Sequence, residues 1–361
     1  MKPLEELISP ATGWYTPEIP LRLDSGIQLS GIRVAYRHWG VLNSSGDNAV
    51  LVCHALTGSA DVDSWWPDLL GPGRALDPMK DYILCSNLLG GCYGTTGPSS
   101  PDPENGRRWG NRFPPVSVRD MVRLQKMLAE HLGVRRWRMV IGGSLGGMQV
   151  LEWGAGYPDW VESMVPIATA VRQPPWAIGF SSVQRQAIEA DRNWLGGDYP
   201  SGQGPRAGLA TAREIAMLSY RHWEGFEQRF GRARHAIHEY EAVSYLNHQG
   251  SRFIDRFDAA SYVLLTRAMD DFDLAAGRGD HPGKLLGGIR IPALVVSIDS
   301  DLLYPPQEQT FLARNLPLAE HVVLRSLHGH DGFLIETERL NAYVCDFRGR
   351  LETSSVRVCC G

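Results

Sequence analysis

The hydrophobic positions change their spacing along the chain, and the first spacing is an alternation typical of β-structure. Leu21 and Leu23 alternate with polar residues, the turn Asp24–Gly26 follows, and Ile27 and Leu29 resume the same period of two. Residues at every second position share one face of a strand, and a short Gly-containing turn joins two such strands. The pattern therefore predicts a β-hairpin near the start of the chain.

From residue 50 the alternation gives way to short runs in which almost every residue is apolar. Such runs are typical of parallel strands that are buried on both faces of a sheet. The predicted strands are Val50–Cys53, Tyr82–Cys85, Met139–Ile141, Met164–Ile167, Ala293–Ile298 and Val322–Leu324.

Helical patterns separate several of these runs. The clearest begins at Ser117, where Asp120 three residues later completes a capping box, and it ends before Gly133. Strands that alternate with helices predict an α/β fold with a mostly parallel sheet and helices on both faces.

The alternation of strands and helices stops in the middle of the chain. Residues 171–288 carry helical periodicity and no convincing strand. We therefore predict an α/β core of residues 1–170 and 289–361, with a helical insertion over 171–288 that covers the active-site edge as a lid. The better helical pieces are Gln184–Ala190, Ala207–Trp223 and Asp258–Leu274.

Composition and charge exclude several classes of partner. The chain has 361 residues, 43% of them hydrophobic, and a formal net charge of −4 without any run of basic residues. We therefore expect no nucleic-acid or anionic-membrane partner. No uninterrupted apolar stretch reaches about 18 residues, and the first residues lack the apolar run of a signal peptide.

The six cysteines have neither the spacing of a disulfide framework nor that of a zinc site. Cys359 and Cys360 are neighbours in the tail, and the others are scattered. We expect a protein of the reducing cytoplasm that binds no metal.

The strongest chemical signal is the segment Gly142–Gly147, which contains G-x-S-x-G around Ser144. It follows the strand that ends at Ile141 and opens a helical pattern. In this context the motif is a nucleophile elbow, whose glycines allow a tight strand-to-helix turn. The sequence thus predicts the α/β-hydrolase fold with Ser144 as nucleophile.

A triad on this fold follows the chain order Ser, Asp or Glu, His. Asp299 and Asp301 both follow a predicted strand, and His328 and His330 both follow the next one. Each of these side chains would lie at the carboxyl edge of the sheet. Spacing alone leaves the choice within each pair open.

An oxyanion hole needs two backbone N–H groups, one of them from the residue after the nucleophile. That residue is Leu145, and we expect the second N–H group from Leu56, in the loop after the strand Val50–Cys53. His54 in the same loop is better interpreted as a structural imidazole bonded to backbone than as a catalytic group.

Several stretches of the chain resemble the homoserine O-acetyltransferase family, α/β-hydrolase-fold enzymes that serve methionine biosynthesis. The resemblance covers about residues 15–345. The matching stretches are Cys53–Gly58, Cys85–Pro98, Gly142–Trp153, Gln184–Ile188, Asp299–Pro305 and Gly329–Asp331.

The resemblance implies roles for individual residues. The family's catalytic acid matches Asp301 and its base matches His330, while Arg213 and Asp331 match residues that bind the amino-acid substrate. It further implies ping-pong transfer of an acetyl group from acetyl-CoA to L-homoserine through acetyl-Ser144. No bound cofactor is expected, and the family is typically homodimeric, with a helical lid between protomers.

Two features of the sequence concern the identity of the acyl donor and of the hydroxyl acceptor. Relatives that transfer succinyl carry an arginine two residues after the catalytic aspartate, where this chain has Leu303, so we expect acetyl-CoA as the donor. Ser64–Pro67 and Arg172–Trp176 resemble relatives that acetylate other hydroxyls, including that of serine. Another hydroxyl acceptor, or an esterase or thioesterase of the same fold, is the alternative.

Overall fold

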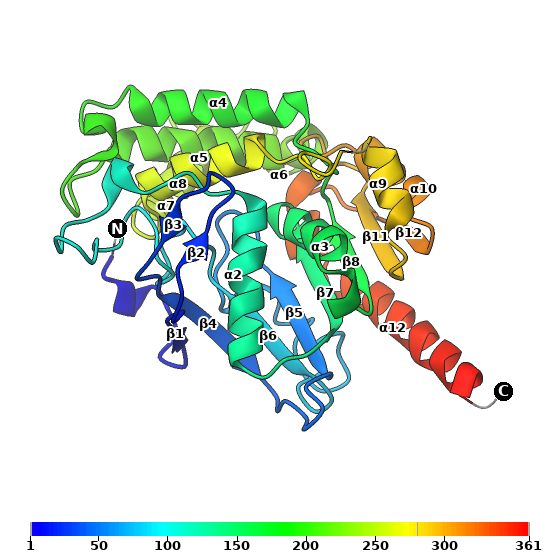
Figure 1. The fold of residues 1–361 in the computed structure, drawn as a ribbon. Helices are drawn as coiled ribbons and strands as arrows, with labels where there is room; N and C mark the ends of the chain where they lie inside the picture. The colour runs from blue at the N-terminus through cyan, green and yellow to red at the C-terminus, as the bar shows by residue number, and fades with distance from the viewer. Residues whose placement is uncertain (1, 280, 360–361) are drawn as a thin grey trace.

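The computed structural model describes residues 2–279 and 281–359, which build a central sheet between two helical layers (Figure 1). The six strands from β6 to β12 in the sheet order run parallel, and β4 is antiparallel to both neighbours. From edge to edge the sheet consists of β1 (Gly13–Tyr15), β4 (Val34–Trp39), β6 (Tyr82–Ser86), β5 (Ala49–Cys53), β7 (Trp137–Gly143), β8 (Met164–Ile167), β11 (Ala293–Ile298) and β12 (Ala319–Leu324). The mostly parallel α/β sheet predicted from the sequence is confirmed.

Successive side chains of the central strands pack into two separate hydrophobic cores, one on each face of the sheet. Because both faces are buried, these strands contain few polar residues. In β5, Leu51 packs into the core shared with α2 (Val118–His131) and α3 (Leu145–Gly156). Its neighbours Val50 and Val52 pack on the other side of the sheet. There the cover is α12 (Thr337–Cys359), which contributes buried apolar side chains.

The predicted helix signals are confirmed at α2. The Ser117 side chain accepts from the Asp120 amide at 3.1 Å, and the Asp120 carboxylate accepts from the Ser117 amide at 2.9 Å. Gly133, with φ of +81°, follows the end of the helix. The predicted hairpin is also present, as β2 (Leu21–Arg22) paired with β3 (Gln28–Leu29).

A layer of helices lies over the carboxyl ends of the parallel strands, at the top of Figure 1. Its packing includes a partly buried ion pair of 2.6 Å between Arg185 and Asp270 and a hydrogen bond of 2.7 Å from the Tyr262 hydroxyl to Gln184. We call α4–α8 the helical layer. Its members are α4 (Pro175–Glu189), α5 (Arg206–Tyr220), α6 (Trp223–Phe230), α7 (Glu241–Phe253) and α8 (Ala259–Asp270).

The expectation of no strand in this middle region is wrong. A small antiparallel hairpin, β9 (Arg234–Ala236) with β10 (Glu239–Tyr240), lies between α6 and α7. All three residues of β9 are exposed, so no alternation of apolar and polar residues marks the strand. Backbone pairing and hydrogen bonds from Arg232 and Arg234 to the Tyr240 hydroxyl hold it together.

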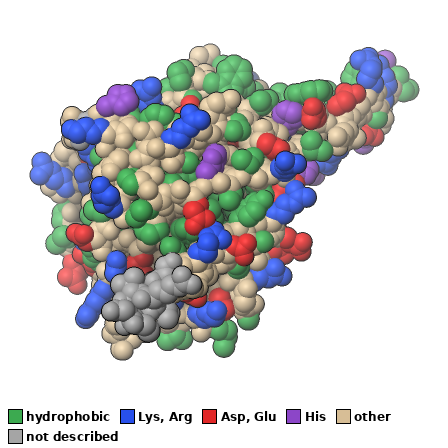
Figure 2. Space-filling model, turned by 90° about the vertical axis from the view of Figure 1, so that its right-hand side faces the viewer, with side chains coloured by type: hydrophobic (Ala, Val, Ile, Leu, Met, Phe, Trp, Pro, Cys, Tyr) green, Lys and Arg blue, Asp and Glu red, His purple; other side chains and the backbone are tan. Residues whose placement is uncertain are grey.

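The remaining α-helices lie outside the helical layer. They are α1 (Val62–Trp65), α9 (Pro282–Gly288), α10 (Pro306–Asn315) and α11 (Gly332–Ile335). None of the helices within residues 2–279 and 281–359 combines the length and hydropathy needed to cross a bilayer. On the face shown in Figure 2, cationic and anionic side chains are interspersed. Cys360 lies outside the described residues.

Candidate active site

Ser144 occupies the sharp turn between β7 and α3. Its φ of 59° and ψ of −122° are unusual for a residue other than glycine, and such a conformation costs roughly 1–3 kcal/mol. The surrounding chain holds it: the Ser144 amide donates to Ile167 O at 3.0 Å, and the Thr169 hydroxyl donates to Ser144 O at 3.0 Å. This geometry is the strained elbow that the sequence predicts.

The elbow glycines allow a close approach between this turn and β5. A Cβ atom on Gly146 would lie 2.0 Å from Cys53 O, and one on Gly142 would lie 2.5 Å from the same oxygen. Both distances are shorter than a real contact. The glycines around Ser144 are therefore required by packing against the end of the neighbouring strand.

Asp301 and His330 form a buried pair at the carboxyl ends of β11 and β12. The His330 Nδ1 atom lies 2.7 Å from Asp301 Oδ2. The other oxygen, Asp301 Oδ1, accepts from the amides of Leu303 at 2.8 Å and Tyr304 at 2.9 Å. The carboxylate is thus fixed from one side by backbone and from the other by the imidazole.

The two rival residues lie elsewhere. Asp299 is exposed, and its carboxylate accepts from the Ser326 amide at 2.9 Å. His328 lines a second cavity of about 320 Å³ beside α6, together with Arg221. The structure therefore brings Asp301 and His330 together and leaves Asp299 and His328 out of that pair.

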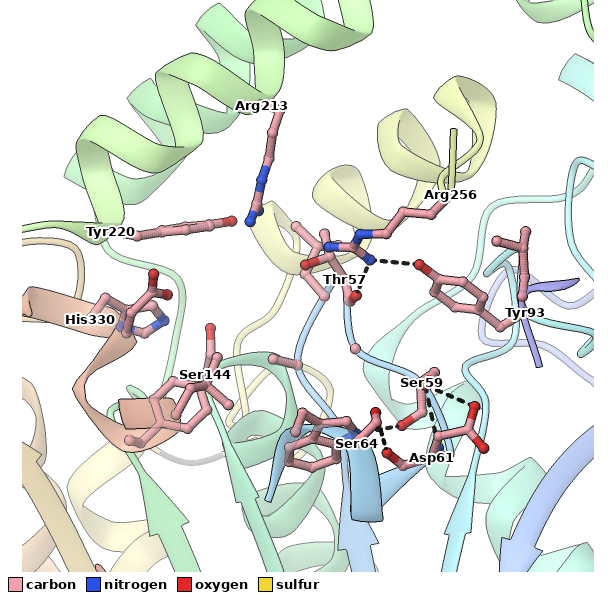
Figure 3. Close-up of a pocket in the computed structure, with 18 of the residues that line it drawn as sticks. Thr57, Ser59, Asp61, Ser64, Tyr93, Ser144, Arg213, Tyr220, Arg256 and His330 are labelled. Atoms are coloured by element: carbon pink, nitrogen blue, oxygen red, sulfur yellow. Dashed lines mark hydrogen bonds between the residues drawn. The ribbon is translucent and has the colours of Figure 1, made fainter. Parts of the chain in front are cut away.

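His330 shares a cavity with Ser144, as Figure 3 shows. Its Nε2 atom is buried and has no hydrogen-bond partner among the described residues. Burial alone would lower the pKa of His330, but the charge and hydrogen bond of Asp301 and the charge of Asp331 raise it above its ordinary value. A neutral His330 therefore has a free nitrogen, with raised basicity, on the cavity side.

The predicted oxyanion donors flank this position. Leu56 lines the cavity, and Leu145 begins α3 directly after Ser144. Neither amide donates a backbone hydrogen bond within the part of the chain that the structure describes. His54 is buried with Nδ1 2.8 Å from Ala55 O, and burial lowers its pKa to about 4, as expected of a neutral structural imidazole.

The cavity has a volume of about 530 Å³ and contains both predicted substrate-binding residues. Arg213 reaches into it from α5, and its buried Nη1 atom has no hydrogen-bond partner among the described residues (Figure 3). Asp331 lines the same cavity and lies 3.1 Å from Arg221. The arrangement places a guanidinium without a carboxylate partner among the described residues, and a carboxylate, in the same cavity as His330.

Tyr220 is a cavity residue that the sequence interpretation missed. It lies seven residues after Arg213 on α5, a spacing that returns to the same helix face after two turns. Its ring centroid lies 5.8 Å from that of His330, and it also lines the cavity. The helical period, counted from Arg213, could have found it.

Leu303, which we expected to favour acetyl-CoA as the donor, does not line the active-site cavity among the described residues. Its side chain is buried in the hydrophobic core. The reason is that its amide donates to Asp301, which directs the backbone around the carboxylate and the side chain into the core. Leu303 can therefore influence an acyl group only through this loop.

Similar proteins share both the sequence and the fold. Residues 48–336 match the family described as alpha/beta hydrolase fold. A homoserine O-acetyltransferase of Trichormus variabilis is 52% identical over 348 residues, which cover 96% of each chain. One of Chloroherpeton thalassium is 52% identical over 347 residues, which cover 96% of this chain and 92% of that protein.

Solved structures with this fold include both transferases and hydrolases. Esterase E22 superposes with a TM-score of 0.85 at 26% identity, covering 93% of this chain and 100% of its own. The homoserine O-acetyltransferase from Bacillus anthracis superposes with a TM-score of 0.86 at 23% identity, covering 93% and 97%. The fold alone therefore does not separate transfer from hydrolysis.

Proposed function

Because the chain belongs to the homoserine O-acetyltransferase family of α/β hydrolases, we propose that it transfers an acetyl group from acetyl-CoA to the hydroxyl of L-homoserine. One observation carries the proposal beyond the fold. Arg213, which has no carboxylate partner among the described residues, lies in the same cavity as Ser144 and His330. A guanidinium of this kind suits the α-carboxylate of an amino-acid acceptor, which a simple ester hydrolase does not need.

In the first half-reaction His330 takes the proton of Ser144, and the serine oxygen attacks the thioester carbonyl of acetyl-CoA. The oxyanion of the tetrahedral intermediate is held by the N–H groups of Leu56 and Leu145. The C–S bond then breaks, His330 returns the proton to the sulfur, and CoA leaves as a thiol. Asp301 keeps the imidazole in the tautomer and orientation that both proton transfers require.

In the second half-reaction the acceptor hydroxyl replaces CoA. Arg213 holds the α-carboxylate and Asp331 accepts from the α-ammonium, which leaves the hydroxyl free to approach acetyl-Ser144. His330 takes the hydroxyl proton as the new ester bond forms, and then gives it to the departing Ser144 oxygen. O-acetylhomoserine leaves, and the serine is regenerated.

Transfer must outcompete hydrolysis of the acetyl-enzyme. A positioned nucleophile can reach an effective molarity on the order of 10⁵ M, far above the concentration of water. We propose that residues 171–288 act as a lid on the core of residues 1–170 and 289–361, and that this lid limits water access. We further propose a cytoplasmic homodimer, in keeping with the family and with the reduced cysteines expected.

The test is the rate of acetyl-CoA consumption with L-homoserine, with L-serine and without acceptor. We expect rapid turnover with homoserine, little with serine and slow turnover alone. Equal rates with and without acceptor would make the protein a hydrolase of acetyl-CoA, and its likeness to esterase E22 is the observation that favours hydrolysis. Competition with succinyl-CoA tests the donor, and efficient succinyl transfer would contradict the acetyl preference.

Replacing Arg213 by alanine is expected to raise the KM for homoserine roughly 10- to 150-fold, because a charge-assisted bidentate bond contributes about 1.5–3 kcal/mol. The rate of the first half-reaction, measured as the burst of CoA release without acceptor, should change little. An equal loss in that burst would show that Arg213 supports the fold or the binding of CoA.

The first half-reaction is expected to lose activity as the pH falls through the raised pKa of His330, because only the neutral imidazole accepts the serine proton. The midpoint of this acid limb should lie above the ordinary 6.5. Asp331→Asn removes one of the charges that raise this pKa, so it should move the midpoint to lower pH. Burst rates across the pH range measure it, and a shift to higher pH would contradict this electrostatic role.

A further inference from the structure

Not every charged side chain around the active-site cavity has an ion-pair partner of opposite charge among the described residues. Each carboxylate that lines the cavity has a cation of its own, whereas Arg213 and Arg256 line it without an ion pair to any carboxylate among residues 2–279 and 281–359. The three carboxylate pairs are Glu6 with Lys2 at 3.5 Å, Asp61 with Arg37 at 2.6 Å, and Asp331 with Arg221 at 3.1 Å.

Arg256 is held rigidly by neutral groups. Its Nη1 atom donates to Thr57 O at 2.9 Å and to the Tyr93 hydroxyl at 2.6 Å. Both bonds use the same nitrogen, so the rest of the guanidinium is left for another acceptor. Figure 3 shows this group entering the cavity between Thr57 and Arg213.

The two guanidinium groups border the same aromatic ring, Phe253, and Figure 3 shows their ends in the same part of the cavity. Their Cζ atoms are 5.1 Å (Arg213) and 5.0 Å (Arg256) from the ring centroid of Phe253, so they are at most about 10 Å apart. Both charges also act on the same phenols. Burial raises the pKa of Tyr93 to about 12 and raises that of Tyr220, and in each case Arg213 and Arg256 both oppose the increase.

Two neighbouring cations without a carboxylate repel each other, and an anion between them relieves that repulsion. We propose that Arg256 is a second carboxylate-binding residue, and that the acceptor's α-carboxylate is held between Arg213 and Arg256. This inference rests on the proposed function. It makes the carboxylate the group by which the site selects its acceptor, while Asp331 faces the ammonium end.

Arg256 also supports the loop that carries Leu56, because it bonds to Thr57 O. The test must therefore separate carboxylate binding from loop positioning. Two ligands do so: L-homoserine and 3-amino-1-propanol, which is homoserine without its carboxylate. Their affinities are measured by calorimetry on the full-length Ser144→Ala protein, which binds but does not react.

We expect Arg256→Met to weaken homoserine binding at least about 10-fold and 3-amino-1-propanol binding less than about twofold. Arg256→Lys, which keeps the charge, should recover part of the homoserine affinity. Tyr93→Phe is the matched control for the anchoring of Arg256, because it removes one hydrogen bond of the guanidinium and keeps both the cation and its bond to Thr57 O. It should cost homoserine clearly less than Arg256→Met, with a thermal melt verifying that each variant is folded.

Each result is decisive. Equal losses for both ligands would assign Arg256 to loop positioning and overturn the proposal. Homoserine binding that Arg256→Met leaves intact would overturn it while the proposed function stands. Homoserine that neither binds the Ser144→Ala protein nor accelerates acetyl-CoA consumption by the unmodified protein would overturn the proposed function and this inference together.

Discussion

Ser144→Ala is expected to lower kcat roughly 10⁴- to 10⁶-fold, the loss typical of removing a triad nucleophile. Without the serine oxygen no acetyl-enzyme can form, and the oxyanion donors alone supply only residual catalysis. Incubation of the unmodified protein with acetyl-CoA alone should add one acetyl group to the peptide that contains Ser144, as measured by mass spectrometry. The alanine variant should gain none.

The variant should keep its fold, which its melting temperature measures. Alanine meets the same backbone strain at φ 59° as serine, and the Ser144 side chain makes no capping hydrogen bond. The Ser144 amide and carbonyl bonds that hold the elbow remain available. Intersecting double-reciprocal lines without an acetyl-enzyme would contradict the covalent mechanism, because they indicate a sequential one.

The buried strands could be predicted because their burial leaves a mark in the sequence. β8 and β11 lie inside the sheet with every residue buried, and their observed bounds agree with the predicted runs. β12 begins three residues earlier than predicted, because it is an edge strand whose first three residues are partly buried or exposed. β9 could not be predicted, because all of its residues are exposed and no apolar pattern marks the strand.

The site was predictable where one segment determines the geometry and not where distant segments meet. Gly142 and Gly146 indicate the elbow in the sequence, because both lie so close to Cys53 O that no side chain fits there. Arg256 carries no such local mark: its partners Thr57 and Tyr93 lie 199 and 163 residues away in sequence. Only the fold brings these groups to one cavity.

The second large effect that we expect is the loss of activity when Asp301 or His330 is replaced. Asp301→Asn should lower kcat by roughly 10⁴-fold, because an amide cannot hold the imidazole in the tautomer that accepts the serine proton. His330→Ala should be at least as severe, since it removes the base itself. Asp299→Asn and His328→Ala serve as matched controls in the same two loops.

The control variants Asp299→Asn and His328→Ala should keep most of their activity, because neither side chain takes part in the Asp301–His330 hydrogen bond. The Asp299 carboxylate accepts from the Ser326 amide, and an asparagine side-chain oxygen can accept the same bond. His328 faces the cavity beside α6, so its loss leaves the Asp301–His330 pair at 2.7 Å undisturbed. Steady-state kinetics of the four variants, each with a verified melting transition, measures the contrast. Severe loss in a control, with activity retained in its partner, would show that the triad uses the other residue of that pair.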